Sequence, residues 1–322
     1  MEEYTVSNTG LEKRSGREVH IPQRTGFRLI WLNSEEWDQL PGIWPAALDR
    51  LEKDWLDMHR PAIPPEDQSE VKEGYLRFFP RVDHLKPGIH FVCYRDLDEQ
   101  GKELAVRFFL TEEALILINR EVISLERLTG WANRGLLSNP LDLAQLLGTR
   151  VLSHHQSRLE KIEDQMEHIE EAILKGPRAW QQARIILLHR RVIGLKKSLN
   201  LHQSVFTKLS NLGKSEQGAL WQELVLDTER ELDNVRQAHE LVESLREAYQ
   251  AAVDNRSNDI MKLLTLLATI LLPINLATSF FGMNFDNMPL IHNPYGIVVF
   301  YAFSALVAIM AFWYFWRKHW LH

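Results

Sequence analysis

The stretch YGIVVFYAFSALVAIMAFWYFW, from Tyr295 to Trp316, decides the fold class of this 322-residue chain. It contains no charged residue, and its length matches the roughly 20 helical residues that a hydrocarbon core of about 30 Å requires. Aromatic residues stand at both ends, as they do at membrane interfaces, and Arg317 and Lys318 follow directly. We therefore predict a transmembrane helix. A long core helix of a large soluble protein is the alternative.

A second apolar stretch, residues 263–281, predicts another span. Basic residues concentrate at the cytoplasmic ends of spans, so Arg317 and Lys318 place the C-terminus in the cytoplasm. Two spans form a hairpin, which puts the N-terminal body on the same side and leaves residues 282–294 facing outward. The chain begins Met-Glu-Glu, without the basic and apolar regions of a signal peptide, and we expect no leader.

Composition excludes several classes of function. The chain has 37 basic and 43 acidic side chains and a net charge of -6, so it lacks the basic field that nucleic-acid binding usually needs. We therefore expect no nucleic-acid partner. The single cysteine, Cys93, cannot form an intramolecular disulfide, which fits a cytoplasmic body. No Walker loop, dinucleotide fingerprint, nucleophile elbow or metalloprotease histidine pair occurs in the sequence, and we expect no enzyme.

The N-terminal part, residues 1–139, mixes strand and helix patterns and predicts an α/β cytoplasmic domain. Short runs of β-branched and aromatic residues, bounded by Gly, Pro, Asp or Asn, predict one mixed sheet. These runs cover residues 27–32, 75–79, 89–94, 104–110 and 114–119. Helical patterns at residues 34–37 and 44–59 predict helices that cover the sheet.

From Asn139 and Pro140 onward the pattern is almost continuously helical, beginning with a cap residue and a proline at the first helical position. Residues 140–218 predict a helical hairpin of the cytoplasmic body. Its two helices cover residues 141–174 and 178–212 and are separated by a Lys-Gly-Pro break.

Residues 219–281 contain no glycine and a single proline, Pro273, so they predict one stalk helix that continues into the first span. At 1.5 Å per residue this helix is roughly 90 Å long. Charged residues alternate with leucines in its first part, which favours a solvated coiled-coil stalk over a catalytic role for the carboxylates. A second transmembrane helix at residues 295–316 and a basic cytoplasmic tail at residues 317–322 complete the chain.

The outward loop opens with Gly282, Met283 and Asn284, and Met288 and Pro289 follow. At the end of the first of two C-terminal spans, this Gly-Met-Asn resembles the signature of the CorA family of divalent-cation channels. The short basic C-terminus is also similar to that of the family. The resemblance is tight over residues 258–321 and looser over the remaining chain.

The resemblance implies a homopentameric, funnel-shaped channel in the plasma (inner) membrane, with N- and C-termini in the cytoplasm. The first span of each protomer lines the pore and the second packs outside it. The cargo is Mg2+, often with Co2+ and Ni2+, and no covalently bound cofactor is implied. In a related ZntB-like branch the cargo is Zn2+. Cytosolic Mg2+, bound by acidic residues between neighbouring bodies, holds the pore shut.

Chemistry gives a separate reason for Asn284 to form a selectivity filter with Gly282 and Met283. Mg2+ releases its water reluctantly, so a filter for the hydrated ion needs neutral oxygens that accept hydrogen bonds from the bound waters. A ring of asparagine amides supplies them and holds the ion weakly enough to release it. Gly282 lets the backbone leave the helix without a side-chain penalty. An ordinary helix cap is the alternative role of Asn284.

The first span carries a stripe at steps of three and four residues, which lies on one face of a helix. The stripe comprises Asn258, Met261, Thr265, Ala268, Leu272, Asn275 and Ser279. By the resemblance, the pore-lining positions below the filter are Asn258, Met261, Leu264, Leu272 and Asn275. Helix packing without a role in permeation is the alternative for Met261 and Leu264.

Several features of the sequence leave the identity of the transported ion undecided. Many magnesium members have glutamate after Met-Pro, but this chain has Leu290, and Asp286 is the single acidic residue of the outward loop. His292 in the same loop favours Zn2+, because imidazole suits that ion. A Zn2+ transporter of the ZntB-like branch is therefore the first alternative. A membrane-anchored structural or sensing protein without a pore is the second.

Other metal-binding candidates are weaker. Four histidines of the helical hairpin, His154, His155, His168 and His189, match no standard zinc spacing, and we expect them to be solvated surface residues. Asp227 on the stalk helix is a candidate for the regulatory metal site.

Overall fold

The computed structural model divides into two compact units. The first unit comprises Met1–His168 and Arg184–Glu243, and the second comprises Ile169–Ala183 and Ser244–His322. Structure is described for residues 2–7, 10–13, 26–32, 79–86, 88–97, 103–118, 123–212, 215–283 and 295–318.

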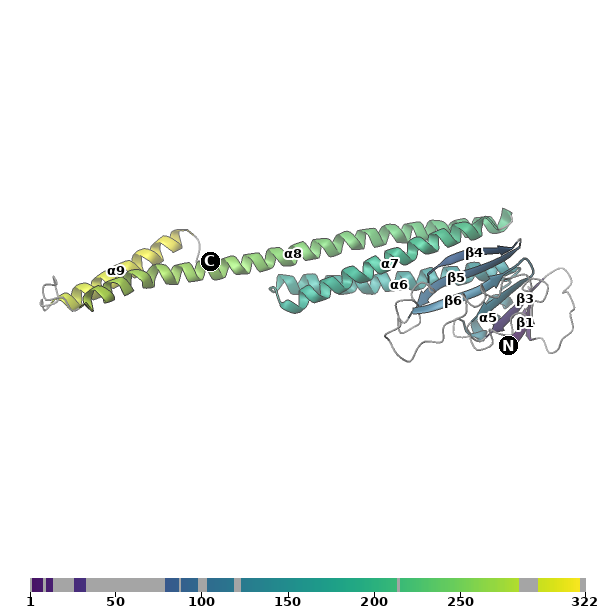
Figure 1. Cartoon of the computed structure of the whole chain (residues 1–322), viewed down its shortest axis with the longest axis horizontal. Helices are drawn as coiled ribbons and strands as arrows, with labels where there is room; N and C mark the ends of the chain where they lie inside the picture. Colours follow the sequence, from purple (N-terminus) through teal and green to yellow (C-terminus); the bar gives the residue numbers. More distant parts are fainter. Residues whose placement is uncertain are drawn as a thin grey trace. The chain divides into compact units, whose positions relative to one another are not determined.

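Within the described residues, the first unit holds a seven-stranded sheet of order β2-β1-β3-β7-β6-β5-β4 (Figure 1). Its strands are β1 (Glu2–Ser7), β2 (Gly10–Lys13), β3 (Phe27–Leu32), β4 (Arg81–Lys86), β5 (Ile89–Leu97), β6 (Glu103–Leu110) and β7 (Ala114–Ile118). β3 and β7 pair in parallel and the other neighbours are antiparallel. The predicted mixed sheet is confirmed.

Four of the five predicted strands correspond to β3, β5, β6 and β7. The fifth, at residues 75–79, and the predicted helices at residues 34–37 and 44–59 lie outside the described residues, apart from Phe79, which forms a bend. The sequence patterns missed β1, β2 and β4. In β1 and β4 few apolar side chains are buried, Tyr4 and Val6 in one and Val82 in the other, because strands near a sheet edge tolerate many polar residues.

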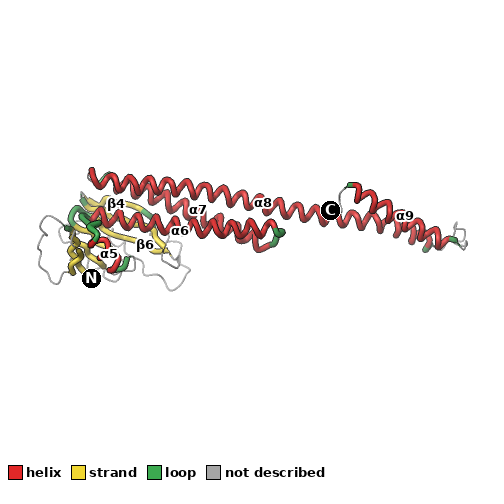
Figure 2. The backbone as a smooth tube through the Cα atoms, turned by 180° about the vertical axis from the view of Figure 1, so that it is seen from behind, coloured by secondary structure: helices red, strands yellow, loops and turns green. Residues whose placement is uncertain are grey.

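The central strands are buried on both faces. One face carries the apolar cluster Ile30, Leu32, Phe91, Cys93, Phe109, Ile116 and Ile118. On β5, Tyr94 points the other way, since neighbouring side chains of a strand alternate. Its hydroxyl donates to the carbonyl of Ala144 at 3.1 Å, and its ring packs 5.5 Å from that of Phe206. Helices therefore cover this second face, as Figure 2 shows from behind.

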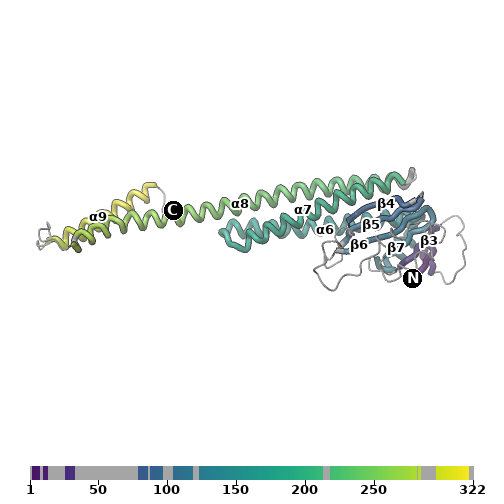
Figure 3. Tube along the Cα trace, in the orientation of Figure 1, coloured from purple at the N-terminus to yellow at the C-terminus, as the bar shows by residue number. Residues whose placement is uncertain are grey.

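The helices are α5 (Leu125–Asn133), α6 (Pro140–Leu174), α7 (Ala179–Ser210), α8 (Ser215–Phe281) and α9 (Gly296–Arg317), and Figure 3 follows their order along the chain. The predicted cap of α6 is confirmed, because Asn139 Oδ1 accepts from the backbone amide of Asp142 at 3.1 Å. The break between α6 and α7 lies at Gly176, whose φ of 120° favours glycine. α8 begins at Ser215 rather than at residue 219, because its first turn includes Gly218, and a glycine costs a helix only about 1 kcal/mol relative to alanine.

Candidate ion pathway

In the described part of the chain, two helices are long and apolar enough to cross a membrane, within Gly218–Phe280 and over Gly296–Arg317. They correspond to the two predicted spans. In the second unit α9 lies beside the C-terminal part of α8 in both Figure 1 and Figure 2. Pro273 lies inside α8, which continues through it to Phe281.

One face of α9 is covered. Its buried and half-buried positions recur at steps of three and four residues and are mostly small or aromatic: Gly296, Phe300, Ser304, Val307, Ala308, Ala311 and Phe315. Small residues let two membrane helices approach closely, and the Ser304 hydroxyl donates to the Phe300 carbonyl at 2.9 Å within its own helix. This face therefore suits direct helix packing.

The matching face of α8 has the same spacing. Its half-buried positions include Leu266, Ile270, Pro273, Ile274 and Ala277. At 3.6 residues per turn these positions fall on one side of the helix, the side that α9 covers. The opposite side of α8 is left exposed within this chain.

The predicted pore-lining residues all lie on that exposed side. They are Asn258, Met261, Leu264, Leu272 and Asn275. Leu272 is 68% exposed, and Met261 and Leu264 are each 59% exposed. An apolar stripe this open in a single chain requires lipid or further protein to cover it. The structure thus distinguishes a face of α8 that packs on α9 from a face that is exposed in the single chain.

The last turn of α8 ends at the predicted filter. The backbone amide of Gly282 donates to the Thr278 carbonyl at 3.0 Å, and that of Met283 donates to the Phe280 carbonyl at 3.3 Å. A Cβ on Gly282 would lie 3.2 Å from the Thr278 oxygen, which is a tight contact. Glycine is thus favoured at position 282 because the Thr278 carbonyl lies close to where a side chain would begin. Asn284 lies outside the described residues.

Asp227 lies on the part of α8 that belongs to the first unit. Its Oδ1 accepts from Arg230 Nη1 at 3.0 Å, one turn along the helix, and its side chain is 41% exposed. An exposed ion pair of this kind contributes at most about 1 kcal/mol. The proposed regulatory role of Asp227 stays a prediction.

The prediction of four solvated histidines is correct only for His168, which is exposed. His155 is 2% exposed and is held in the core between α6 and α7 by Ser198. His154 is half-buried, and its Nδ1 lies 2.7 Å from Asp96 Oδ1. The prediction was wrong for His155 because Ser198, which holds its Nε2, comes from α7 and cannot be seen in the spacing along α6.

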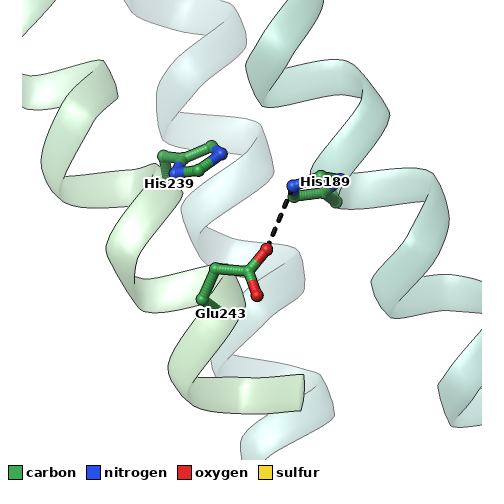
Figure 4. A group of neighbouring side chains, drawn as sticks. All are labelled: His189, His239 and Glu243. Carbon is green, nitrogen blue, oxygen red and sulfur yellow. Dashed lines mark ion pairs between the residues drawn. The ribbon is translucent and has the colours of Figure 1, made fainter. Parts of the chain in front are cut away.

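His189 is also half-buried and belongs to a group with His239 and Glu243 (Figure 4). The sequence pattern pointed to His189 but not to the other two residues. The signal available for them was their spacing of four along a predicted helix, which places both side chains on one face. Their approach to His189 depends on how α7 packs on α8.

The chain combines an α/β unit with two helices that can cross a membrane, and the first of these is the apolar end of the long helix α8. This combination defines a membrane protein with a large extramembrane body. Residues 51–318 match the family model described as "CorA-like Mg2+ transporter protein". The chain belongs to this family. Its members are channels or transporters, so the protein is not an enzyme.

Individual relatives agree with this assignment. The cobalt/magnesium transport protein CorA of Thermotoga maritima is 29% identical, over 99% of this chain and 91% of that protein. The fold resembles the complete structure of the CorA magnesium transporter from Methanocaldococcus jannaschii, with a TM-score of 0.78 and 19% identity, over 100% of this chain and 99% of that one. The cytoplasmic domain of ZntB from Vibrio parahaemolyticus is less similar, with a TM-score of 0.58 and 10% identity, over 79% of this chain and 98% of that one.

Proposed function

We propose that five copies of this chain form a channel for hydrated Mg2+, with Co2+ and Ni2+ as further cargo. The observation that carries the proposal is the exposed stripe of α8, which leads to Gly282 and Met283 while α9 covers the opposite face; Asn284 is the next residue in the sequence. Family membership and the Mg2+ and Co2+ in the names of relatives support the choice of ion. In this arrangement the stripe faces a central axis and α9 faces lipid.

The stripe itself suits a pore that opens and closes. Apolar side chains such as Met261 and Leu272 form a constriction that closes when it loses its water. Asn275 places an amide among them, and a polar group at membrane depth is favoured where it faces water or protein. The hydroxyls of Thr265, Thr269 and Thr278 donate to carbonyls of their own helix and so need no partner outside it.

The driving force is the membrane potential. It contributes about 2.3 kcal/mol per charge per 100 mV, so entry of a doubly charged ion needs no ATP if the cytoplasm is negative. This polarity requires the orientation proposed for the chain in the plasma (inner) membrane, with both termini in the cytoplasm. Binding of a cytosolic cation to the body closes the channel, and Asp227 is a candidate ligand for that ion.

The test is ion flux into liposomes that contain the purified full-length protein and an internal Mg2+ dye. Asn284→Ala removes the proposed filter amide and is expected to abolish the flux. Asn287→Ala, in the same loop, is the matched control and should retain it. Equal flux in the wild type and Asn284→Ala would contradict the filter assignment.

A paired assay with Zn2+ separates the two ion choices, and the mass of the purified complex tests the pentamer. Faster entry of Zn2+ than of Mg2+ would favour the Zn2+ alternative, for which His292 is the supporting feature. A monomer or dimer cannot surround an axial pore and would contradict the channel.

A further inference from the structure

The clearest group of metal-ligating side chains away from the proposed pathway lies in the first unit, where α7 packs beside α8 (Figure 4). His239 and Glu243 stand one turn apart on α8, and His189 approaches from α7. His189 Nε2 lies 3.1 Å from Glu243 Oε1, and the two imidazole ring centroids are 5.2 Å apart. We propose that these three residues bind a transition-metal divalent cation of the Zn2+, Co2+ or Ni2+ class.

The distances suit one ion. Each residue offers one ligand atom, and the three atoms lie within 4.8 Å of one another. Bonds of about 2.0–2.2 Å to a tetrahedral ion place two ligand atoms roughly 3.4 Å apart. His189 and Glu243 are already near this separation, and the largest remaining gap closes by roughly 1.4 Å. Because all three side chains are half-buried, rotation of their outer bonds supplies this movement without a change in the helices.

The ligand set selects the class of ion. Two imidazoles and one carboxylate suit Zn2+, Co2+ and Ni2+, whereas Mg2+ prefers oxygen ligands and retains most of its water. Three protein ligands leave at least one position for water, so the ion can enter from the half-exposed side. The site should therefore bind a transition-metal ion in the presence of excess Mg2+. This selectivity differs from that of the amide filter proposed at Asn284.

The position of the site gives binding a structural consequence. An ion held by His189 on one side and by His239 and Glu243 on the other links α7 to α8. Without the ion, the His189 imidazole and the Glu243 carboxylate still meet across the two helices, but both side chains are half-exposed, and a polar contact of this kind contributes at most about 1 kcal/mol. An ion that binds only the folded arrangement raises the melting temperature as its concentration increases. This effect can be measured without any ion flux.

The first test is calorimetric titration of the full-length protein with Zn2+, in detergent and in the presence of excess Mg2+. The second is the visible spectrum of the Co2+ form. We expect one ion per chain at this site, with His189→Ala and His239→Ala each weakening its binding at least about tenfold. Loss of even an outer-shell partner of a metal ligand typically costs 10- to 100-fold. The same variants should lose the intense absorption of tetrahedral Co2+. His168→Ala, an exposed histidine on α6, is the control and should bind as the wild type does.

Asn284→Ala separates this proposal from the proposed pore, since it should lose flux and keep the Zn2+ site. Unchanged Zn2+ affinity in both histidine variants, or displacement of Zn2+ by Mg2+, would overturn the site. If the variants fail to fold, carbethoxylation of the wild-type histidines serves instead. Zn2+ should then protect His189 and His239 but not His168, and equal modification with and without Zn2+ would overturn the proposal.

Discussion

His155 Nε2 lies 2.9 Å from the hydroxyl oxygen of Ser198 in the buried interior of the first unit. The other ring nitrogen, Nδ1, lies 2.8 Å from the carbonyl oxygen of Val151, which can only accept, so Nδ1 carries the proton. Because burial lowers the pKa of His155 and keeps its ring neutral, Nε2 carries no proton and accepts from the Ser198 hydroxyl. The neighbouring His202 is also neutral, because its Nδ1 donates to the Ser198 carbonyl and its Nε2 accepts from the amide of Arg95. The packing of α6 on α7 thus requires two uncharged imidazoles.

Acid should destabilise this interior. Burial lowers the pKa of His155 from its ordinary 6.5 to about 4, and it lowers the pKa of His202 well below the ordinary value. Between pH 6.5 and 4 the unfolded chain therefore binds protons that the folded chain does not, and the free energy of unfolding decreases as the pH is lowered. For His155 alone the free energy of unfolding decreases by about 3 kcal/mol between pH 6.5 and 4, and above pH 6.5 there is no such decrease. Denaturant unfolding of the full-length protein across this pH range measures the effect.

His155→Gln should reduce the pH dependence, because glutamine does not titrate. The variant itself is expected to be less stable at neutral pH, so the slope against pH is the informative quantity. His168→Gln replaces an exposed histidine of the same helix and should leave the slope unchanged. The explanation fails if His155→Gln and the wild type lose stability equally between pH 6.5 and 4.

Gly148 should be the less replaceable of two helical glycines. A Cβ there would meet Phe206 Cε1 at 2.9 Å and Leu224 Cδ2 at 3.0 Å, and both of these side chains are buried. Overpacking costs about 1–3 kcal/mol, against roughly 1 kcal/mol gained in helix propensity, so Gly148→Ala should destabilise by about 1 kcal/mol. Gly194→Ala, with nothing within 4 Å of its Cβ, should stabilise by roughly 0.5–1 kcal/mol. Equal midpoints of denaturant unfolding for the two variants would contradict this account.

The sequence predicted those features that depend on neighbouring residues. The cap at Asn139 and the apolar length of α9 are local patterns, and both are present in the structure. The strand β4 was missed because a single apolar side chain, Val82, is buried in it. The neutral state of His155 and the approach of His189 to Glu243 depend on the packing of separate helices, and spacing along one helix does not contain that information.

The face of α8 that bears Leu272 and Asn275 can be distinguished from the face that bears Ile270 by cysteine substitution. If the exposed stripe lines a water-filled pore, a positively charged methanethiosulfonate should react with Leu272→Cys and Asn275→Cys and block Mg2+ flux into liposomes. Ile270→Cys, on the side that α9 covers, should react slowly and keep its flux.

The native Cys93 can remain in these variants. It is buried in the sheet, and burial raises the pKa of its thiol, so little thiolate is available to react. The wild type treated with the same reagent is therefore the baseline, and its flux should not change. Block of Ile270→Cys with free flux through Leu272→Cys would place the water-filled path on the α9 side of α8 and reverse the proposed arrangement. Because the two positions differ by only two residues along one helix, their depth in the membrane is nearly equal, and the comparison reports the face of the helix.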